Sequence, residues 1–408
     1  MSEVEVGEEL LFAGLKVLDV ATWIAGPVAG TILADYGADV IKVEQPGAGD
    51  AYRNYWRTPT IPQAPANYPW LTDARNKRSL SLNLRDPEAK AILLDLVRQA
   101  DVYITNQPMP MRRAFGLTYE ELAPINGRLI YASISAYGES GPDAGREAFD
   151  GVAWWTRSGL ADLVRAPGAL PGGSVPGMGD HPTAVSLYAA IVTALLRRER
   201  TGKGSHVHTN LMHNGIWSNA CLASSAFVDG VDFAPLKAEK PPAVSRELYE
   251  TADGRLLQLF MVRTQAELDG VLIAAEGFDI LNDARFATAE ARASHTVEFI
   301  QELRGLFGQR TAAEWLATFR EARAPVNLVA EITDFADDIQ LQAAGVISPP
   351  SDPAVGARFV INQPLNIDGM PRVGALPAPE CGQHTDEILR EMGLSPERIS
   401  QLRAKGAV

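Results

Sequence analysis

Residues 15–21 form a short apolar run that is typical of a buried strand. A turn containing Gly and Pro follows it, and the apolar positions of residues 28–36 then recur at the spacing of a helix. Residues 39–44 form a second apolar strand. A strand, a helix and a strand in such close succession predict a βαβ unit, whose strands are parallel, and therefore an α/β fold.

The same order of elements recurs further along the chain. Residues 79–84 predict a strand, and Asp86 followed by Pro87 has the form of a helix start, with a capping side chain and a proline in the first turn. This helix is expected to end near Gln99. Two further strands follow, at 101–105 and 128–135. Together these elements predict one mostly parallel sheet of the Rossmann type.

The later part of the chain divides in two. A helix predicted at 181–200 is apolar around most of its circumference, so we expect it to be buried against the sheet. After a polar link at 233–246, a short strand at 255–262 precedes three helical stretches that reach residue 321, and this region is expected to be a second domain. Two last helices are expected to return and pack on the first domain, at 385–392 and 396–404.

Composition narrows the class of protein. The chain has 408 residues, 46% hydrophobic and 21% charged, which is ample for a core. Its formal net charge is −13 and its basic residues are scattered, which argues against nucleic acid and anionic membrane as partners. Cys221 and Cys381 stand far apart, which predicts a reducing compartment without disulfides. Residues 1–5 lack signal-peptide features and no segment has the ~20 apolar residues of a membrane span, so a cytoplasmic enzyme is expected.

The turn at 23–30 joins a strand to a helix N-terminus, where free N–H groups favour an anion. Glu44 ends the next strand, where a dinucleotide-binding fold places its ribose-binding acid. A nicotinamide or flavin enzyme is thus one hypothesis, although the glycine fingerprint is absent and Pro27 lies in the middle of the turn. The simpler interpretation is a tight connection, which accounts for Gly26 and Gly30. Residues 54–70 have no periodicity and predict an irregular surface loop, of a kind that often shapes a site.

Asp180 is the strongest candidate for chemistry. An Asp before an early proline, at the start of a long apolar helix, has the form of an N-cap, and capping is a common use of Asp. Asp180 also follows two glycines on a loop without large neighbours, so a substrate carbonyl can reach its carboxylate, which has the form of a nucleophile. The spacing alone leaves both roles open.

Three histidines, His206, His208 and His213, lie in a predicted strand and the helix after it. The first two share one strand face, but no third ligand and no carboxylate or cysteine cluster accompanies them, so no metal site is predicted. Trp154 and Trp155 are interpreted as core residues.

Six segments, taken in order, resemble the signature segments of the family III CoA-transferases. They are LKVLDVATWIAGPVAGTILADYGADVIKVEQPGAGD, ARNKRSLSLNL, ADVYITN, RLIYASISAYGESGP, RRERTGKGSHVHTNLM and PAPECGQHTDEILREMG. The resemblance covers nearly the whole chain and is specific, because the six segments keep their order and separation. That family includes formyl-CoA, carnitine and bile-acid CoA-transferases and, as divergent members, 2-methylacyl-CoA racemases.

The resemblance implies a Rossmann-like large domain built from both ends of the chain, with a smaller α+β domain inserted between them. The expected boundaries are 1–224 for the N-terminal part of the large domain, 225–330 for the small domain, and 331–408 for a linker and the C-terminal part of the large domain. Two such subunits are expected to interlock as a homodimer, so that the folded monomer is not expected to be stable alone.

The resemblance also aligns Asp180 with the family's catalytic aspartate. The implied reaction begins when this carboxylate attacks an acyl-CoA thioester, which gives a mixed anhydride and CoA thiolate; the thiolate then forms an aspartyl-CoA thioester, and an acceptor carboxylate reverses the sequence. CoA thioesters are substrates here, and neither a tightly bound cofactor nor a metal is expected. The positions that match the family's CoA contacts are Ala25, Arg75, Lys77, Arg78, Asn106, Arg112 and Arg113. Arg146 is a candidate to replace the lysine that the family often has at Glu147.

Two positions separate this chain from particular members. Ile24 stands where formyl-CoA transferases carry Gln, and residues 236–246 are rich in Lys and Pro where those enzymes have a glycine-rich loop, so oxalate or formate chemistry is not expected. The IAGPVAG loop, the chain length and the segment ETADGRLLQLFMVRTQAE look closer to carnitine-type members. Phe149 stands where the racemases have the His of a His-Asp pair, and because Phe cannot abstract an α-proton, a racemase is the weaker alternative. A non-catalytic CoA-binding protein is the alternative of another class. The aromatic residues Trp23, Trp154, Trp155 and Phe149 predict a pocket for an acyl group larger than the formyl group.

Overall fold

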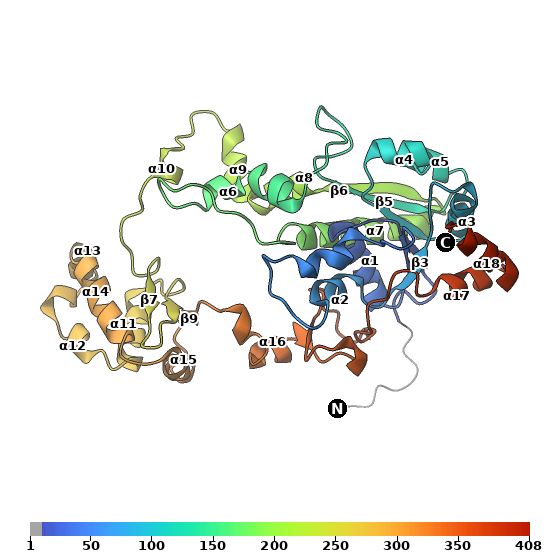
Figure 1. Cartoon of the computed structure of the whole chain (residues 1–408). Helices are drawn as coiled ribbons and strands as arrows, with labels where there is room; N and C mark the ends of the chain where they lie inside the picture. The colour runs from blue at the N-terminus through green and yellow to red at the C-terminus, as the bar shows by residue number, and fades with distance from the viewer. Residues whose placement is uncertain (1–9) are drawn as a thin grey trace. The chain divides into compact units, whose positions relative to one another are not determined.

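The computed structural model describes residues 10–408, so the acidic stretch at residues 1–5 lies outside the described residues. Six parallel strands form the main sheet, in the order β3-β2-β1-β4-β5-β6 (Figure 1). Their bounds are β1 (Lys16–Asp19), β2 (Asp39–Glu44), β3 (Arg78–Ser81), β4 (Val102–Thr105), β5 (Ile130–Ser135) and β6 (Ser205–Asn210). This is the strand order of a doubly wound Rossmann fold, and the prediction of an α/β fold is confirmed.

Helices cover both faces of this sheet because successive strand residues point to opposite sides. On β1, Val17 belongs to a core that also contains residues of α1 (Ala25–Asp35) and α7 (Asp180–Thr201). Its neighbour Leu18 belongs to a second core, on the other face, with residues of α3 (Pro87–Val97). Both faces of the sheet are therefore buried under helices, as is usual for a parallel sheet.

The predicted tail helices close the second core. They are α17 (Thr385–Glu391) and α18 (Pro396–Ala404), and they lie beside β3 and α3 in Figure 1. Backbone N–H groups of the edge strand β3 donate to this tail, from Ser79 to the His384 Nδ1 atom at 3.1 Å and from Ser81 to the Thr385 hydroxyl at 3.0 Å. The tail thus protects an edge that would otherwise be open to pairing.

Two helix starts test the capping predictions. The Asp86 carboxylate accepts from the N–H groups of Glu88 at 2.8 Å and Ala89 at 3.1 Å, so its predicted capping role is confirmed. The N-cap role considered for Asp180 is wrong, because α7 begins with Asp180 itself and Gly179 is the N-cap. A Cβ atom at Gly179 would lie only 2.4 Å from the Trp154 ring, so this N-cap position has no room for a side chain.

Residues 237–338 form a compact unit with its own core, and the rest of the chain, up to Leu236 and from Ile339 onward, forms the other unit. The smaller unit contains an antiparallel sheet of β7 (Leu248–Glu250), β8 (Leu256–Gln258) and β9 (Asn327–Leu328). Its main helices are α11 (Gln265–Ala274), α14 (Thr296–Phe307) and α15 (Ala312–Glu321). Its core is aromatic, with the rings of Trp315 and Phe319 stacked at a centroid distance of 5.5 Å.

The remaining elements are short. They are the 3₁₀ segment Ala51–Arg57, α2 (Tyr68–Ala74), α4 (Met109–Phe115), α5 (Tyr119–Leu122), the π-helical turn Gly151–Thr156, α6 (Leu160–Leu163), α8 (Leu211–Ser218), α9 (Ala220–Ala223), α10 (Ala234–Lys237), α12 (Phe278–Leu281), α13 (Ala289–Ser294), α16 (Ile339–Ala343), β10 (Ile347–Ser348) and β11 (Val360–Ile361), with further 3₁₀ segments at Ser224–Phe227, Ala284–Phe286, Ile332–Asp334 and Pro353–Val355. The prediction of an irregular loop at 54–70 is wrong at both ends, because the 3₁₀ segment extends to Arg57 and α2 begins at Tyr68.

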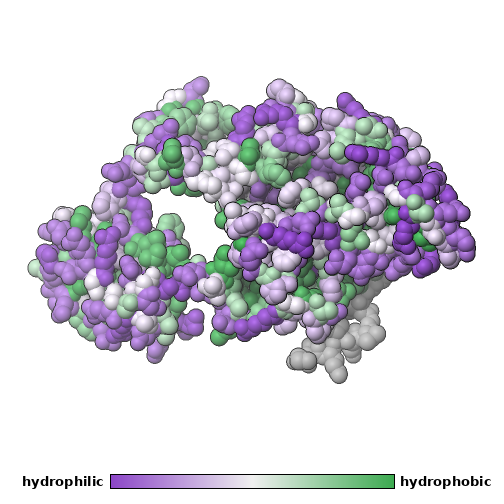
Figure 2. Space-filling model, in the orientation of Figure 1, coloured by the Kyte–Doolittle hydropathy of each residue, from purple (hydrophilic) through white to green (hydrophobic). Residues whose placement is uncertain are grey.

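Apolar side chains remain exposed on the larger unit. The space-filling view shows hydrophobic residues at the surface over α6 and α9 (Figure 2). The exposed large side chains between α8 and α10 are Ile216, Trp217, Leu222, Phe227, Val228, Phe233 and Leu236, of which Phe227 is 87% exposed. Within residues 10–408, no helix combines the length and the apolarity that crossing a membrane requires.

Candidate active site

The loop after β1 is held rigidly at the carboxyl end of the sheet. The Asn106 side chain accepts from the N–H of Thr22 at 2.9 Å and donates to its carbonyl at 2.7 Å. Trp23 has a left-handed backbone with φ of 65°, and its N–H donates to the Asp50 carboxylate at 3.1 Å. A Cβ atom at Gly26 would lie 2.5 Å from that of Ala21, so only glycine allows this tight connection.

A cluster of buried, mutually paired charges lies beneath this loop. Lys77 contacts Asp19 at 2.8 Å, and Lys42 contacts Asp50 at 2.9 Å and Asp19 at 3.9 Å, with all four side chains fully buried. Burial lowers the pKa of Lys77, and the charge of Asp19 opposes that effect. The Lys77 ammonium also donates to the Pro27 carbonyl at 2.6 Å, so this cation ties α1 to the sheet.

Asp180 is half-buried at the first position of α7, and burial together with the nearby acids disfavours its charge. Burial, and after it the charge of Asp150, raise the pKa of Asp180 to about 7, while the charge of His181 acts in the opposite direction. Asp150 is fixed in place, because its two oxygens accept from the N–H groups of Gly179 at 3.0 Å and Gly151 at 2.8 Å. A carboxylate with a raised pKa is also more basic, which favours nucleophilic attack.

A hydrogen-bonded chain of three side chains adjoins Asp180. The Tyr52 hydroxyl donates to one oxygen of Asp73 at 2.7 Å, and the other oxygen lies 3.0 Å from the Nε2 atom of His181. Although burial lowers it, the hydrogen bond and charge of Asp73 raise the pKa of His181 to about 9. Burial and the charge of Asp73 raise the pKa of Tyr52, which keeps this phenol a donor.

Aromatic rings gather beside this carboxylate cluster. The Trp23 and Phe149 rings meet edge to face at 4.9 Å, and Tyr55 stands edge to face with Trp23 at 6.4 Å. Burial raises the pKa of Tyr55, and Tyr68 and then the charge of Asp150 raise it further, so Tyr55 lies near that acid. Phe149 is 58% exposed. By contrast, Trp154 and Trp155 are buried in a core cluster, which confirms their interpretation as core residues.

The predicted CoA contacts fall into two groups. Ala25 begins α1, Asn106 fastens the loop described above, and Arg113 is exposed, with no acidic partner found among residues 10–408. The other cations already have acidic partners. Arg75 binds Asp35 through two hydrogen bonds of 2.7 and 3.1 Å, and the buried Arg112 contacts Glu139 at 2.6 Å. Arg146 is exposed and pairs with Asp143 at 2.7 Å.

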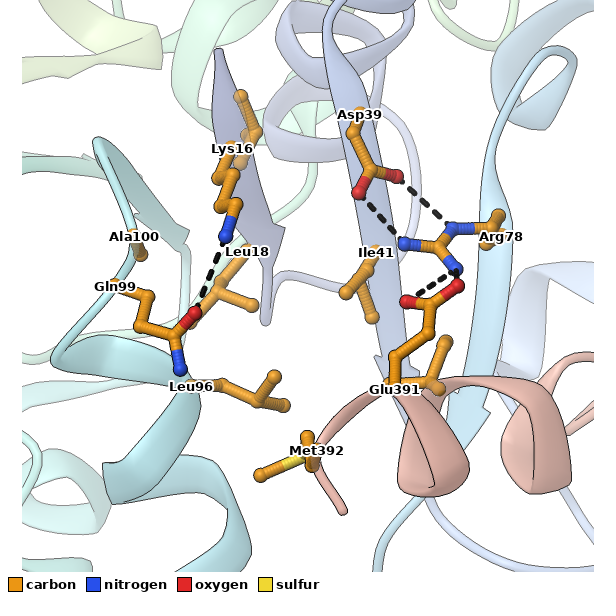
Figure 3. Close-up of a pocket in the computed structure, with 12 residues that line it drawn as sticks. Lys16, Leu18, Asp39, Ile41, Arg78, Leu96, Gln99, Ala100, Glu391 and Met392 are labelled. Carbon is orange, nitrogen blue, oxygen red and sulfur yellow. Dashed lines mark hydrogen bonds and ion pairs between the residues drawn. The ribbon is translucent and has the colours of Figure 1, made fainter. Parts of the chain in front are cut away.

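Arg78 lies in a different place, beside a pocket of about 120 Å³ lined by residues that include Lys16 and Asp39, the first residues of β1 and β2. Its guanidinium forms two hydrogen bonds with Asp39 and contacts Glu391 of α17 at 2.8 Å (Figure 3). These ion pairs fasten α17 to the amino ends of β2 and β3. The catalytic candidates follow the carboxyl ends, so this pocket is separate from them.

The dinucleotide hypothesis for Glu44 is wrong. Its carboxylate accepts from the Arg53 guanidinium at 2.6 and 2.8 Å, from the Ser79 hydroxyl at 2.7 Å and from the Asp50 N–H at 2.9 Å. These bonds occupy the oxygens that a ribose would need. The His206 and His208 rings are 5.3 Å apart, and no group of three metal-ligating side chains occurs in the described chain.

Sequence reasoning did not single out Asp73, Tyr52, His181 or Asp150 as parts of the site. The available signals were local ones: His181 directly follows Asp180, and Asp150 directly follows the position compared with the racemases. Asp73 and Tyr52 carry no such signal, since they reach the site only through the fold.

Comparison with known proteins identifies the class to which this fold and site belong. A family model described as CoA-transferase family III matches residues 12–385, so the chain belongs to that family. The structure is similar to that of a CAIB/BAIF family protein from Brucella suis, with a TM-score of 0.82 and 26% identity over 94% of this chain and 100% of that one.

Curated relatives match over the same length. The chain is 28% identical to the (R)-2-hydroxy-4-methylpentanoate CoA-transferase of Clostridioides difficile, over 97% of this chain and 98% of that protein. It is 30% identical to a formyl-CoA:oxalate CoA-transferase of Rhodopseudomonas palustris, over 97% and 96%. The prediction is confirmed: this chain is a family III CoA-transferase, an enzyme that moves CoA between acyl-CoA thioesters and carboxylic acids.

Proposed function

We propose that Asp180 carries the transfer as a covalent nucleophile. Its carboxylate attacks the acyl-CoA carbonyl and CoA leaves as the thiolate, which gives an acyl-aspartyl anhydride. The thiolate then attacks the aspartyl carbonyl, which releases the first acid and leaves an aspartyl-CoA thioester. The acceptor carboxylate reverses these two steps and leaves with CoA. The observation that carries this proposal is the half-buried Asp180 carboxyl at the first position of α7. Its pKa is raised to about 7, and α7 has no side-chain cap hydrogen bond.

The acid substrate is proposed to be a monocarboxylic acid with an apolar side chain larger than that of formate. Supporting this, Trp23, Tyr55 and Phe149 form an aromatic group, of which Tyr55 is coupled electrostatically to Asp150. The names of two relatives specify acids with bulky apolar groups, 2-hydroxy-4-methylpentanoate and, in a Clostridium sporogenes enzyme that is 29% identical, phenyllactate. Phe149→Ala is expected to lower kcat/KM about tenfold for an aryl acid, since burial of an aromatic ring is lost, and much less for acetate.

CoA is proposed to bind along the loop that Asn106 fastens, with Ala25 at the start of α1 and Arg113 as the exposed cation for a phosphate group. Arg75, Lys77, Arg78 and Arg112 are more readily explained as supports of this region, since each already contacts an acid. Guanidinium groups bind phosphate well because their N–H groups match its oxygens.

The enzyme is proposed to be a homodimer. Seven large apolar side chains from α8 to α10 are exposed, among them Trp217 at 75% and Phe227 at 87%, and burial of such side chains would favour association with a second copy. We also propose that the enzyme works in a reducing, cytoplasmic compartment. Supporting this, both cysteines are free thiols.

Trapping of the enzyme-bound intermediate tests the function directly. The enzyme is incubated with acyl-CoA and then with hydroxylamine, which should convert Asp180 to a hydroxamate visible by peptide mass spectrometry. An unmodified Asp180, together with full transferase activity of Asp180→Ala, would overturn the proposal. The racemase alternative has a separate readout, since it requires solvent deuterium to enter the α-carbon of a 2-methylacyl-CoA.

A further inference from the structure

The His181 ring lies between two hydrogen-bond acceptors. Its Nδ1 atom is 3.0 Å from the Gly177 carbonyl oxygen, and its Nε2 atom is 3.0 Å from an Asp73 carboxylate oxygen. A carbonyl oxygen has no proton to donate, and the other Asp73 oxygen already accepts from Tyr52. A neutral imidazole has one N–H and one acceptor nitrogen, so it would leave one of these contacts without a proton. Only the doubly protonated, positively charged ring can donate to both acceptors at once.

The charges around this ring show what the cation compensates. Three carboxylates lie in the cluster, Asp73 on α2, Asp150 before the π-helical turn and Asp180 on α7. The Tyr52 hydroxyl of the 3₁₀ segment completes the set, and it is neutral. Lys77 donates at 3.4 Å to the backbone carbonyl of Asp73, but its charge is matched by the buried Asp19. The charge of Lys77 is therefore already used by Asp19, outside the cluster. The positive charge of His181 remains to balance the three carboxylates.

We propose that His181, held in place by Asp73 and Tyr52, is a positioning residue whose positive charge keeps the neighbouring Asp180 ionised for attack on the thioester. Both ring N–H groups are engaged with Asp73 and Gly177, so His181 acts on Asp180 through its charge and donates no proton to the reaction. The inference rests on the proposed nucleophilic role of Asp180. It adds that the adjacent Asp180-His181 pair is a matched unit, with the charge state of the second residue controlling the first.

The decisive variant is His181→Gln, which retains a side-chain N–H for Asp73 and loses the charge. The charge of His181 lowers the pKa of Asp180, so its removal is expected to raise that pKa by about one unit. The acid limb of kcat/KM against pH is therefore expected to move upward by about one unit, so that activity falls about tenfold at pH 6 and approaches wild type near pH 9. The same substitution at the exposed His213 of α8 is the matched control and should leave the limb in place. An equal loss at every pH, with the limb unmoved, would overturn the inference.

A measurement on the unmodified enzyme keeps the inference open to refutation where His181→Gln does not fold. The chain has six histidines, so single substitutions of the other five assign the remaining imidazole signal to His181 by NMR. Its ring is expected to stay doubly protonated at pH 8, where an unperturbed imidazole is neutral. A neutral ring at pH 7 would overturn the inference. This titration is independent of the hydroxylamine trap, so absence of trapping with a charged His181 would count against the nucleophile alone.

Discussion

Two charge clusters lie close together at the carboxyl end of the sheet, and they are built differently. Beneath the loop after β1, Asp19 and Asp50 face Lys42 and Lys77, so two acids meet two bases in full burial. Around α7, three acids, Asp73, Asp150 and Asp180, face one half-exposed histidine. The balanced cluster supports the fold, whereas the unbalanced cluster raises the pKa of one carboxyl toward neutrality. Burial is the main cause of that raised pKa, and the uncompensated charge of Asp150 adds to it. If Asp180 is the nucleophile as proposed, an excess of acid charge distinguishes the reactive cluster from the structural one.

The largest expected effect comes from Asp180→Asn, which tests whether the unbalanced cluster is the catalytic one. Loss of a covalent nucleophile is expected to lower kcat by at least about a thousandfold, because the remaining groups cannot form the anhydride. Initial-rate assays with an acyl-CoA donor and an acid acceptor measure it. The control is Asp229→Asn, at an exposed acid outside the cluster. A loss below tenfold would show that the excess charge does not mark the nucleophile.

Lys77→Met is expected to have the next largest effect, and it acts on stability. It leaves Asp19 buried with only Lys42, at 3.9 Å, to balance it. Removing one partner of a buried ion pair typically costs about 3–5 kcal/mol. Denaturant unfolding measures the change, with Lys203→Met on the exposed surface as control. If Lys77→Met unfolds like wild type and instead weakens CoA binding, Lys77 belongs with the ligand contacts, and the contrast between the two clusters fails.

The sequence allowed the order of strands and helices to be predicted because those signals are local. The apolar strands, the Asp86 cap and the tail helices depend on residues a few positions apart. The N-cap of α7 was missed by one residue. The constraint on that position is a long-range one, because a Cβ atom at Gly179 would clash with Trp154. The same reason applies to the site: Asp180 had a motif, but His181 and Asp73 are 108 residues apart, and no local pattern joins them.

The two arginines of α4 extend the comparison to the proposed CoA site. Arg112 is buried and paired with Glu139, whereas its neighbour Arg113 is exposed without an acidic partner among residues 10–408. Arg113→Ala is expected to raise the KM for acyl-CoA about tenfold with an unchanged Tm, because an exposed phosphate contact is lost. Arg112→Ala is expected to lower the Tm instead, because Glu139 loses its cation. The reverse pattern, measured by kinetics and thermal unfolding of both variants, would reassign the phosphate contact to Arg112.

The smallest expected effect concerns the stability cost of the raised pKa of Asp180. A carboxyl whose pKa is raised on folding, here to about 7, binds its proton more tightly in the folded chain, so ionisation favours the unfolded chain. The cost is absent below about pH 4, grows as the pH rises, and is complete above about pH 7. Asp180→Asn removes the charge and should raise the Tm by about 2 °C at pH 8 but not at pH 4. For Lys77→Met, in the balanced cluster, the Tm is expected to fall instead. If Asp180→Asn also lowers the Tm at pH 8, the Asp180 carboxylate stabilises the fold, and the two clusters are alike.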